Sequence, residues 1–94
     1  MAWYVYIVEC ADGTLYTGVA TDVARRLEEH NGAGAKGKGA RYTATRRPVT
    51  LRCALSCEDR STAMREEYRI KQLTRGEKLL IISTLGTRAL EARH

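Results

Sequence analysis

Phenol, guanidinium and imidazole side chains recur in the first third of the chain at spacings that could form one reactive site. Tyr4-Val5-Tyr6 and Tyr16-Thr17-Gly18 are separated by nine residues, and Arg26 and His30 follow four residues apart. A guanidinium can neutralise an anionic phosphate oxygen with a fixed fork of N–H donors. A phenol can accept a proton only where its pKa falls well below about 10, whereas an imidazole can exchange one near neutral pH. This set is suited to chemistry on an anionic ester.

Several common catalytic patterns are absent from the sequence. It contains no G-x-x-x-x-G-K, no H-E-x-x-H and no Ser/His/Asp pattern, and its glycines at 32, 34, 37 and 39 follow no strand that would make them a dinucleotide fingerprint. The three cysteines are Cys10, Cys53 and Cys57. An odd number without an expected signal peptide predicts reduced thiols that act as small buried side chains.

Two strands and a helix are predicted to position the candidate residues. The aromatic and β-branched run at 3–8 and the run at 15–19 predict strands joined by Asp12-Gly13, which is a strong hairpin signal. Thr21 or Asp22 can cap a helix that runs to about His30.

The second half of the chain adds a strand at 49–56 and two helices. The helix expected at 60–73 should bury a face made of four apolar residues, Ala63, Met64, Ile70 and Leu73. Thr74-x-x-Glu77 is a capping box before a strongly apolar third helix. The predicted order is β-β-α-β-α-α, an α/β (α+β) domain with a three-stranded, mostly antiparallel sheet flanked by helices. We expect one domain over 1–86 and a polar tail over 87–94.

In this arrangement the chain resembles the GIY-YIG nuclease family. Tyr4-Val5-Tyr6 is similar to the first half-motif and Tyr16-Thr17-Gly18 to the second, and Arg26 follows Gly18 by eight positions, as the family's helix arginine does. The resemblance covers about residues 3–82 and looks closest to small stand-alone bacterial members. The literal G-I-Y is Y-V-Y here. Gly18, which has no Cβ, is expected to be structural, because it allows close packing.

The resemblance implies a catalytic set of Tyr6, Tyr16, Arg26, His30 and Glu66. Glu66 looks like the metal-binding glutamate and would hold one Mg²⁺ or Mn²⁺ ion. Arg26 would neutralise a phosphate oxygen, Tyr6 is the leading general base, Tyr16 would orient water or substrate, and His30 would assist proton transfer. From the residues alone, Tyr4 and Tyr6 share one strand face, and one or both could instead be core aromatics with a satisfied hydroxyl.

Three neighbouring positions have competing interpretations. Counting back from Ile70-Lys71 selects Glu66, although Glu67 has the same chemistry one residue later. Arg25 is the alternative to Arg26. His30 could simply be a cation that interacts with the C-terminal end of its helix.

The charge of the chain favours a polyanionic partner. Its 94 residues carry 16 Lys and Arg against 11 Asp and Glu, for a net charge of +5 and a pI near 9.4. A pI above 9 is typical of nucleic-acid-binding domains. The Gly- and Lys-rich stretch at 32–41 and the residues after it supply candidate nucleic-acid contacts, namely Lys36, Lys38, Arg41, Tyr42, Arg46, Arg47 and Lys71.

We therefore predict a divalent-metal-dependent endonuclease that hydrolyses DNA phosphodiester bonds. One small domain should select duplex, branched or single-stranded DNA by structure rather than by sequence, or through a targeting protein, and the resemblance implies repair or recombination. The alternatives are a non-catalytic nucleic-acid-binding module and a protein-interaction domain that uses the apolar helix at 79–85. No apolar run approaches the roughly 18–20 residues that span a bilayer, so we expect a cytoplasmic protein without a membrane partner. The sequence leaves the oligomeric state open.

Overall fold

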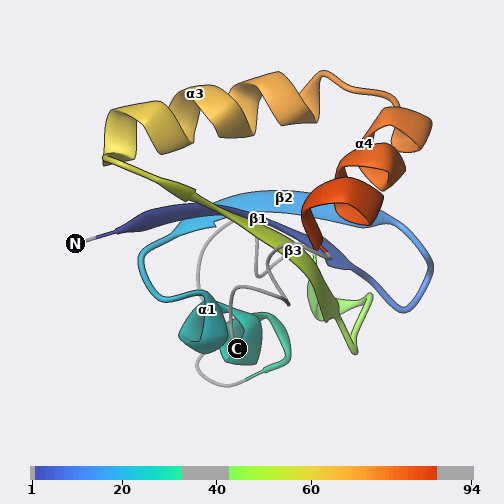
Figure 1. Ribbon diagram of the computed structural model, residues 1–94. Helices are drawn as coiled ribbons and strands as arrows, with labels where there is room; N and C mark the ends of the chain where they lie inside the picture. Colours follow the sequence, from blue (N-terminus) through green and yellow to red (C-terminus); the bar gives the residue numbers. More distant parts are fainter. Residues whose placement is uncertain (1, 33–42, 87–94) are drawn as a thin grey trace.

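The computed structural model describes residues 2–32 and 43–86, and its centre is a three-stranded antiparallel sheet (Figure 1). The strands are β1 (Trp3–Glu9), β2 (Leu15–Ala20) and β3 (Thr50–Cys57), in the order β2-β1-β3. The central strand has four consecutive buried residues, 5–8, because both of its faces are covered. The predicted fold class and element order are confirmed.

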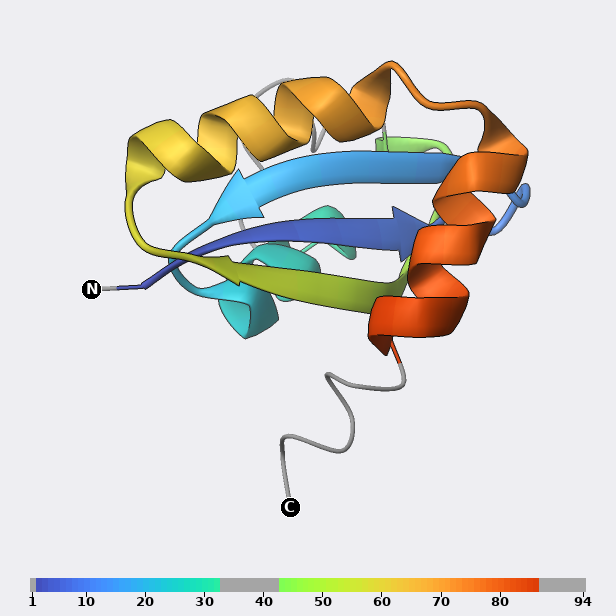
Figure 2. The same ribbon diagram turned by 45° about the horizontal axis from the view of Figure 1, so that its top comes forward.

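The helices cover the two faces of the sheet unequally. Helix α1 (Val23–His30) lies on one face, and α3 (Arg60–Lys71) and α4 (Arg75–Ile81) lie on the other (Figure 1). A π-helical turn, η1 (Ile82–Gly86), follows α4 directly. Figure 2 shows α3 running along β2, the edge strand, while α4 crosses one end of the strands. The edge of the sheet at β2 is therefore covered by α3 on one face, while α1 lies on the opposite face of the sheet (Figure 1, Figure 2).

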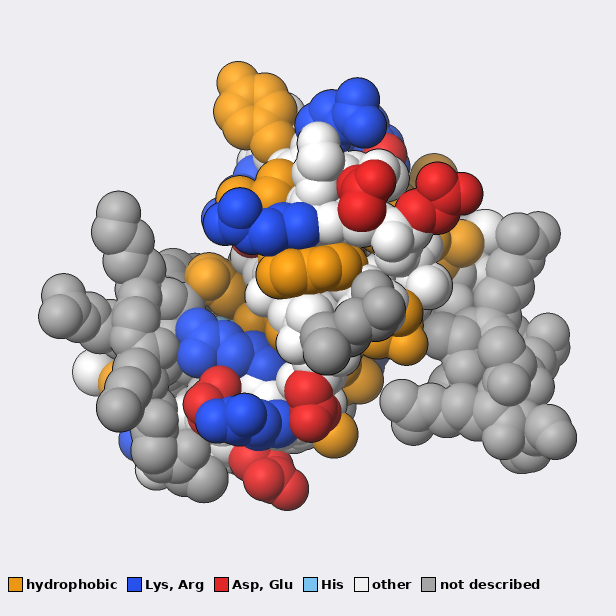
Figure 3. All heavy atoms as spheres, turned by 90° about the vertical axis from the view of Figure 1, so that its left-hand side faces the viewer, with side chains coloured by type: hydrophobic (Ala, Val, Ile, Leu, Met, Phe, Trp, Pro, Cys, Tyr) orange, Lys and Arg blue, Asp and Glu red, His pale blue; other side chains and the backbone are white. Residues whose placement is uncertain are grey.

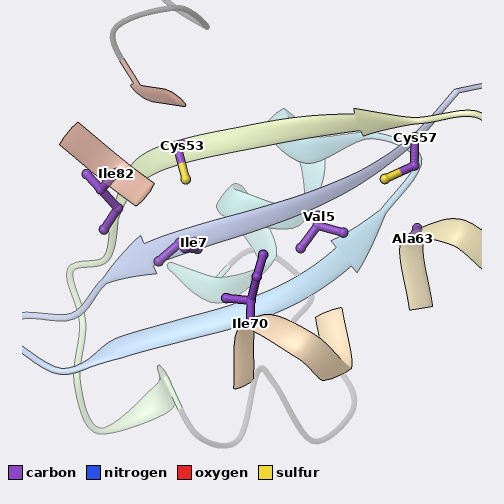
Figure 4. Packing of buried hydrophobic residues seen from close by; sticks show 7 residues of the cluster. All are labelled: Val5, Ile7, Cys53, Cys57, Ala63, Ile70 and Ile82. Carbon is purple, nitrogen blue, oxygen red and sulfur yellow. The ribbon is translucent and has the colours of Figure 1, made fainter. Parts of the chain in front are cut away.

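Two hydrophobic clusters follow from the alternation of side chains along β1. On the α3 side, Val5 and Ile7 pack with Cys53, Cys57, Ala63, Ile70 and Ile82 (Figure 4). On the α1 side, Tyr6 and Val8 pack with Cys10 and Val49. All three cysteines are free and buried, as predicted. Tyr6 belongs to the α1-side cluster, which places its phenol near α1.

Local sequence signals set the ends of the helices. The Asp22 carboxylate accepts a hydrogen bond from Arg25 N at 3.0 Å, so Asp22 is the N-cap of α1. The predicted capping box of Thr74 and Glu77 is confirmed at the start of α4. In the turn between β1 and β2, Gly13 has a φ of +85°, which favours glycine.

The structure corrects part of the predicted buried faces. Met64 was expected in the core, but it is 43% exposed, because α3 buries Ala63 and Ile70 and turns Met64 to the outside. Leu79 and Leu80 are also exposed, and the buried residue of this apolar run is Ile82 in η1. The tail at 87–94 lies outside the described residues. Within the described parts of the chain, no helix is long and apolar enough to cross a membrane.

Candidate active site

A hydrogen-bonded chain of three side chains lies beneath the sheet. The Tyr6 hydroxyl lies 2.8 Å from His30 Nε2, and His30 Nδ1 lies 2.8 Å from Thr43 Oγ1. Each of these residues is at most 1% exposed. Thr43 has one hydroxyl proton, which it donates to the His30 carbonyl oxygen at 3.4 Å. Its oxygen then accepts the Nδ1 proton of His30, which leaves Nε2 as the acceptor of the Tyr6 proton.

Gly18 is required by the position of the Tyr6 ring. The two residues are directly opposite each other in the β1–β2 register. A Cβ on Gly18 would lie 2.6 Å from Cζ of Tyr6 and closer still to its hydroxyl oxygen. The missing side chain at position 18 therefore lets the phenol extend across β2 toward α1.

Tyr16 brings a second phenol to the same place. Its ring makes an edge-to-face contact with His30, with the ring centroids 5.4 Å apart, and Tyr6 makes a similar contact at 5.9 Å. Tyr16 also packs against the α1-side cluster. The two half-motif tyrosines and His30 thus form one aromatic group at the β2 edge, and Tyr16 is its more exposed member.

Arg26 places a positive charge beside these phenols. It hydrogen-bonds to Tyr6 and pairs with Glu29, Nη1 to Oε1, at 3.3 Å. Burial raises the pKa of Tyr6 to about 12, although the hydrogen bond and charge of Arg26 act in the opposite direction. Burial also raises the pKa of Tyr16, and the charge of Glu67 adds to that effect. Both phenols are therefore protonated at neutral pH in this state of the protein.

Glu67, rather than Glu66, faces the tyrosines. Its charge raises the pKa of both Tyr6 and Tyr16, and its carboxylate lies 3.6 Å from Nζ of Lys71. Lys71 Nζ in turn lies 5.8 Å from the centroid of the Tyr16 ring. The side chain of Glu67 is 18% exposed. Helix α3 therefore reaches the aromatic group over the β2 edge, from the face opposite α1.

Glu66 lies on the other side of α3. Its Oε2 accepts hydrogen bonds from Arg69 Nη2 at 2.8 Å and from Nε at 3.1 Å. The pKa of the Cys57 thiol is raised by burial and then by the charges of Glu66 and Asp59. Consecutive residues of an α-helix point about 100° apart, so two adjacent glutamates cannot both face one site. The tertiary contacts thus separate Glu67 from the residue that the sequence analysis selected.

One carboxylate at this site would suit a single, weakly held divalent ion. No cluster of three or more His, Cys, Asp or Glu residues that could hold a metal occurs within 2–32 and 43–86. The carboxylate that faces the phenols is that of Glu67. Mg²⁺ keeps several waters and is commonly held by one or two carboxylates together with substrate phosphate. Glu67 would therefore hold such an ion, and the ion would supply Lewis-acid stabilisation of a bound phosphate.

The predicted nucleic-acid contacts have different surroundings. Lys71 lies at the site, whereas Arg46 pairs with Asp12 at 3.2 Å, Nε to Oδ2. Arg47 Nε donates a hydrogen bond of 2.8 Å to the His30 carbonyl oxygen, which ties the segment before β3 to the end of α1. The predicted contacts that fall within 33–42 lie outside the described residues, namely Lys36, Lys38, Arg41 and Tyr42.

Two residues near His30 were not selected from the sequence: Thr43, which hydrogen-bonds to its ring, and Asn31, which follows it in the chain. Thr43 had no signal beyond the similarity of Arg41-Tyr42-Thr43 to the family. Asn31 follows His30, and its amide group pairs with the backbone of Val49 through bonds of 2.8 Å and 3.1 Å. Asn is common at helix ends in general, so the sequence alone did not indicate that Asn31 would hydrogen-bond to the backbone of Val49.

A groove of about 260 Å³ opens beside Arg26 and is continuous with the solvent. Its lining includes Trp3 at the start of β1 and Arg25, whose side chain is 74% exposed. Figure 3 shows Lys or Arg and Asp or Glu side chains gathered at the bottom of its view, over α1. Asp22 and Glu29 also line this groove, so its lining carries both positive and negative charge next to Arg26.

Comparisons with known proteins show which family the chain resembles over most of its length. The GIY-YIG catalytic domain matches residues 2–79. A UPF0213 protein of Desulfotalea psychrophila is 55% identical over 91 residues, which cover 95% of this chain and 80% of that protein. A UPF0213 protein of Halobacterium salinarum is 57% identical over 75 residues, which cover 80% and 92%. The solution NMR structure of a UPF0213 protein from Bacillus halodurans is 38% identical, with a TM-score of 0.58 over 92% of this chain and 87% of that one.

Proposed function

The chain belongs to the GIY-YIG family, and on that premise we propose that it is a divalent-metal-dependent endonuclease that hydrolyses DNA phosphodiester bonds. Membership of this family supports a nuclease-type function. The observation that carries the finer proposal is the convergence of Tyr6, Tyr16, His30 and Arg26 with Glu67 of α3 at one sheet edge. These groups supply a proton path, a positive charge and a carboxylate, which hydrolysis of an anionic ester requires.

Tyr6 and His30 form the proposed proton path. Tyr6 has a pKa of about 12 and donates to Nε2 of His30, so it is not a free phenolate. As water attacks phosphorus, the Tyr6 oxygen accepts the water proton while its own proton moves to Nε2. The new P–O bond forms, the bond to the leaving oxygen breaks, and that oxygen takes a proton from solvent. The resulting imidazolium keeps its other proton on Nδ1 and donates it in a hydrogen bond to Thr43 Oγ1.

Arg26 and a metal ion held by Glu67 would neutralise the negative charge of the substrate. Arg26 is the fixed cation for a non-bridging phosphate oxygen, because its hydrogen bond to Tyr6 holds it beside the proposed general base. Glu67 is the proposed holder of one Mg²⁺ or Mn²⁺ ion, which supplies Lewis-acid stabilisation of the phosphate when bound. The effect of the Glu67 charge on the pKa of both tyrosines, together with its ion pair to Lys71 beside the Tyr16 ring, supports this choice over Glu66. Release of Lys71 from Glu67 would leave its ammonium group for the phosphate backbone.

Selection by shape rather than by base sequence is part of the proposal. Arginine and lysine contacts to phosphate fix position but carry no base information. The domain match covers most of this chain, so the candidate site and the DNA-binding surface would share one small fold. A role in DNA repair or recombination is proposed from the resemblance to the GIY-YIG nuclease family.

A cleavage assay with two matched glutamate variants tests the proposal. Labelled single-stranded, duplex and branched DNA would be incubated with Mg²⁺ or Mn²⁺ and wild type, Glu67→Gln or Glu66→Gln. We expect metal-dependent cleavage by wild type, a loss of at least about 100-fold in Glu67→Gln and near-normal cleavage in Glu66→Gln. A large loss of cleavage in Glu66→Gln with near-normal cleavage in Glu67→Gln would instead assign the metal ion to Glu66. Salt-sensitive binding without cleavage by wild type would favour the non-catalytic module.

A further inference from the structure

Helix α3 carries an exposed apolar pair immediately beside the candidate site. Tyr68 is 70% exposed and Met64 is 43% exposed, four residues apart on the same helix face. Ala63 and Ile70 anchor α3 to the sheet at 0% and 2% exposure. The Tyr68 ring is therefore available to a partner without any change in how α3 packs.

Helical spacing joins this pair to the site. Met64, Glu67, Tyr68 and Lys71 stand at positions i, i+3, i+4 and i+7, which form one continuous stripe. The polar members of the stripe reach the aromatic group, since Glu67 influences both phenols and Lys71 lies 5.8 Å from the Tyr16 ring centroid. Tyr68 and Met64 are thus the outward continuation of the same surface.

Two cations flank the exposed ring along α3. Arg65 precedes Tyr68 by three residues and Lys71 follows it by three, so both are helical neighbours of the ring. Arg65 is exposed, and Lys71 is 46% exposed. Figure 3 shows hydrophobic side chains next to Lys or Arg side chains at the top of its view, over α3. An aromatic face between cations is complementary to a nucleobase between phosphates.

We propose that Tyr68, supported by Met64, stacks on an unpaired nucleobase of the strand whose phosphate enters the site. The inference rests on the proposed nuclease function and adds the feature of DNA that this site selects. Inside a duplex both faces of each base are already stacked, so a free face occurs in single strands, flaps and junctions. Stacking on Tyr68 would therefore favour DNA with an unpaired segment over blunt duplex, without any preference for base identity.

Binding in EDTA, where no metal-dependent cleavage takes place, separates stacking from catalysis. Fluorescein-labelled single-stranded DNA and blunt duplex would be titrated with wild type, Tyr68→Ala, Tyr68→Trp and Leu80→Ala. Leu80 is 68% exposed on α4, so it is a matched control for loss of an exposed hydrophobe. We expect Tyr68→Ala to raise the single-strand Kd by about 5- to 150-fold, with little change for duplex. Tyr68→Trp and Leu80→Ala should bind like wild type.

A second readout reports the stack itself. Quenching of 2-aminopurine in the single strand should occur with wild type and disappear with Tyr68→Ala. Unchanged single-strand affinity in Tyr68→Ala, or an equal loss for duplex, would overturn the inference even if wild type cleaves DNA. If Tyr68→Ala loses single-strand affinity as expected but wild type does not cleave DNA in any assay, the stacking surface is supported and the nuclease proposal is refuted. No DNA binding at low salt would overturn both.

Discussion

Replacement of Gly18 by alanine tests whether the site depends on the close approach of β2 to the Tyr6 ring. The added Cβ would lie 2.6 Å from Tyr6 Cζ, and the ring is 1% exposed and hydrogen-bonded to His30. Overpacking of this kind costs about 1–3 kcal/mol, and a strained Tyr6–His30 bond adds about 1 kcal/mol. The lower backbone entropy of unfolded alanine returns about 0.5–1 kcal/mol. The net loss in the free energy of unfolding should be about 1–3 kcal/mol.

Gly18→Ala should lower both stability and activity, which thermal or chemical denaturation and a DNA cleavage assay measure. A net loss of this size corresponds to a fall in Tm of at least about 4 °C for a domain of this length. Displacement of the Tyr6 oxygen from His30 should also reduce kcat by about 10-fold or more, because proton transfer depends on that geometry.

Gly76→Ala is the matched control for Gly18→Ala. The nearest atom to a Cβ at position 76 is Thr74 Oγ1 at 4.0 Å, and the residue is in α4. Alanine there should stabilise the protein by about 0.5–1 kcal/mol without affecting cleavage. A Gly18→Ala protein as stable as wild type, with normal cleavage, would refute the argument that glycine is required beside the ring.

Two further predictions concern the Tyr6–His30–Thr43 chain. Burial raises the folded-state pKa of Tyr6 to about 12 from about 10, so the folded state keeps a proton that the unfolded state loses, and stability should fall between pH 10 and pH 12 by up to about 2–3 kcal/mol. Urea unfolding at several pH values should show that Tyr6→Phe lacks this part of the fall in the free energy of unfolding. Equal slopes of that free energy against pH in wild type and Tyr6→Phe would contradict the effect of burial on the Tyr6 pKa. Thr43→Val removes the acceptor 2.8 Å from His30 Nδ1 and should lower stability by about 1–3 kcal/mol and kcat by about 10-fold, whereas Thr45→Val, at an exposed position, should change neither. Denaturation and cleavage assays measure these effects on stability and kcat. A Thr43→Val protein with unchanged stability and kcat would exclude Thr43 as a positioning residue.

Local sequence patterns determined the elements and much of the fold. Asp12-Gly13 predicted the hairpin because the turn needs a positive φ, and the side chains of Asp22 and Thr74 cap helices at the positions where a helix must begin. These signals act within a few residues, so they can be recognised without knowledge of the rest of the chain. The order β-β-α-β-α-α followed from them, and the structure confirms it.

The direction in which α3 faces could not be determined from its own sequence. Its periodicity was compatible with a buried Met64, and the two adjacent glutamates had equal chemistry. Only packing on β2 decides that Ala63 and Ile70 enter the core, that Glu67 reaches the phenols and that Glu66 pairs with Arg69. A helix rotation of about 100° separates these alternatives, and long-range contacts set that rotation.

Sequence by itself identified the half-motif tyrosines, Arg26 and His30, because each occupies a recognisable place on a hairpin or its following helix. Tertiary structure alone decided where the Tyr6 hydroxyl lies, since the absent Cβ of Gly18 admits its ring and distant Thr43 hydrogen-bonds to His30. Hydrogen bonds between residues 13 and 24 positions apart leave no periodic trace in the chain. They form only when the strands and α1 have packed together.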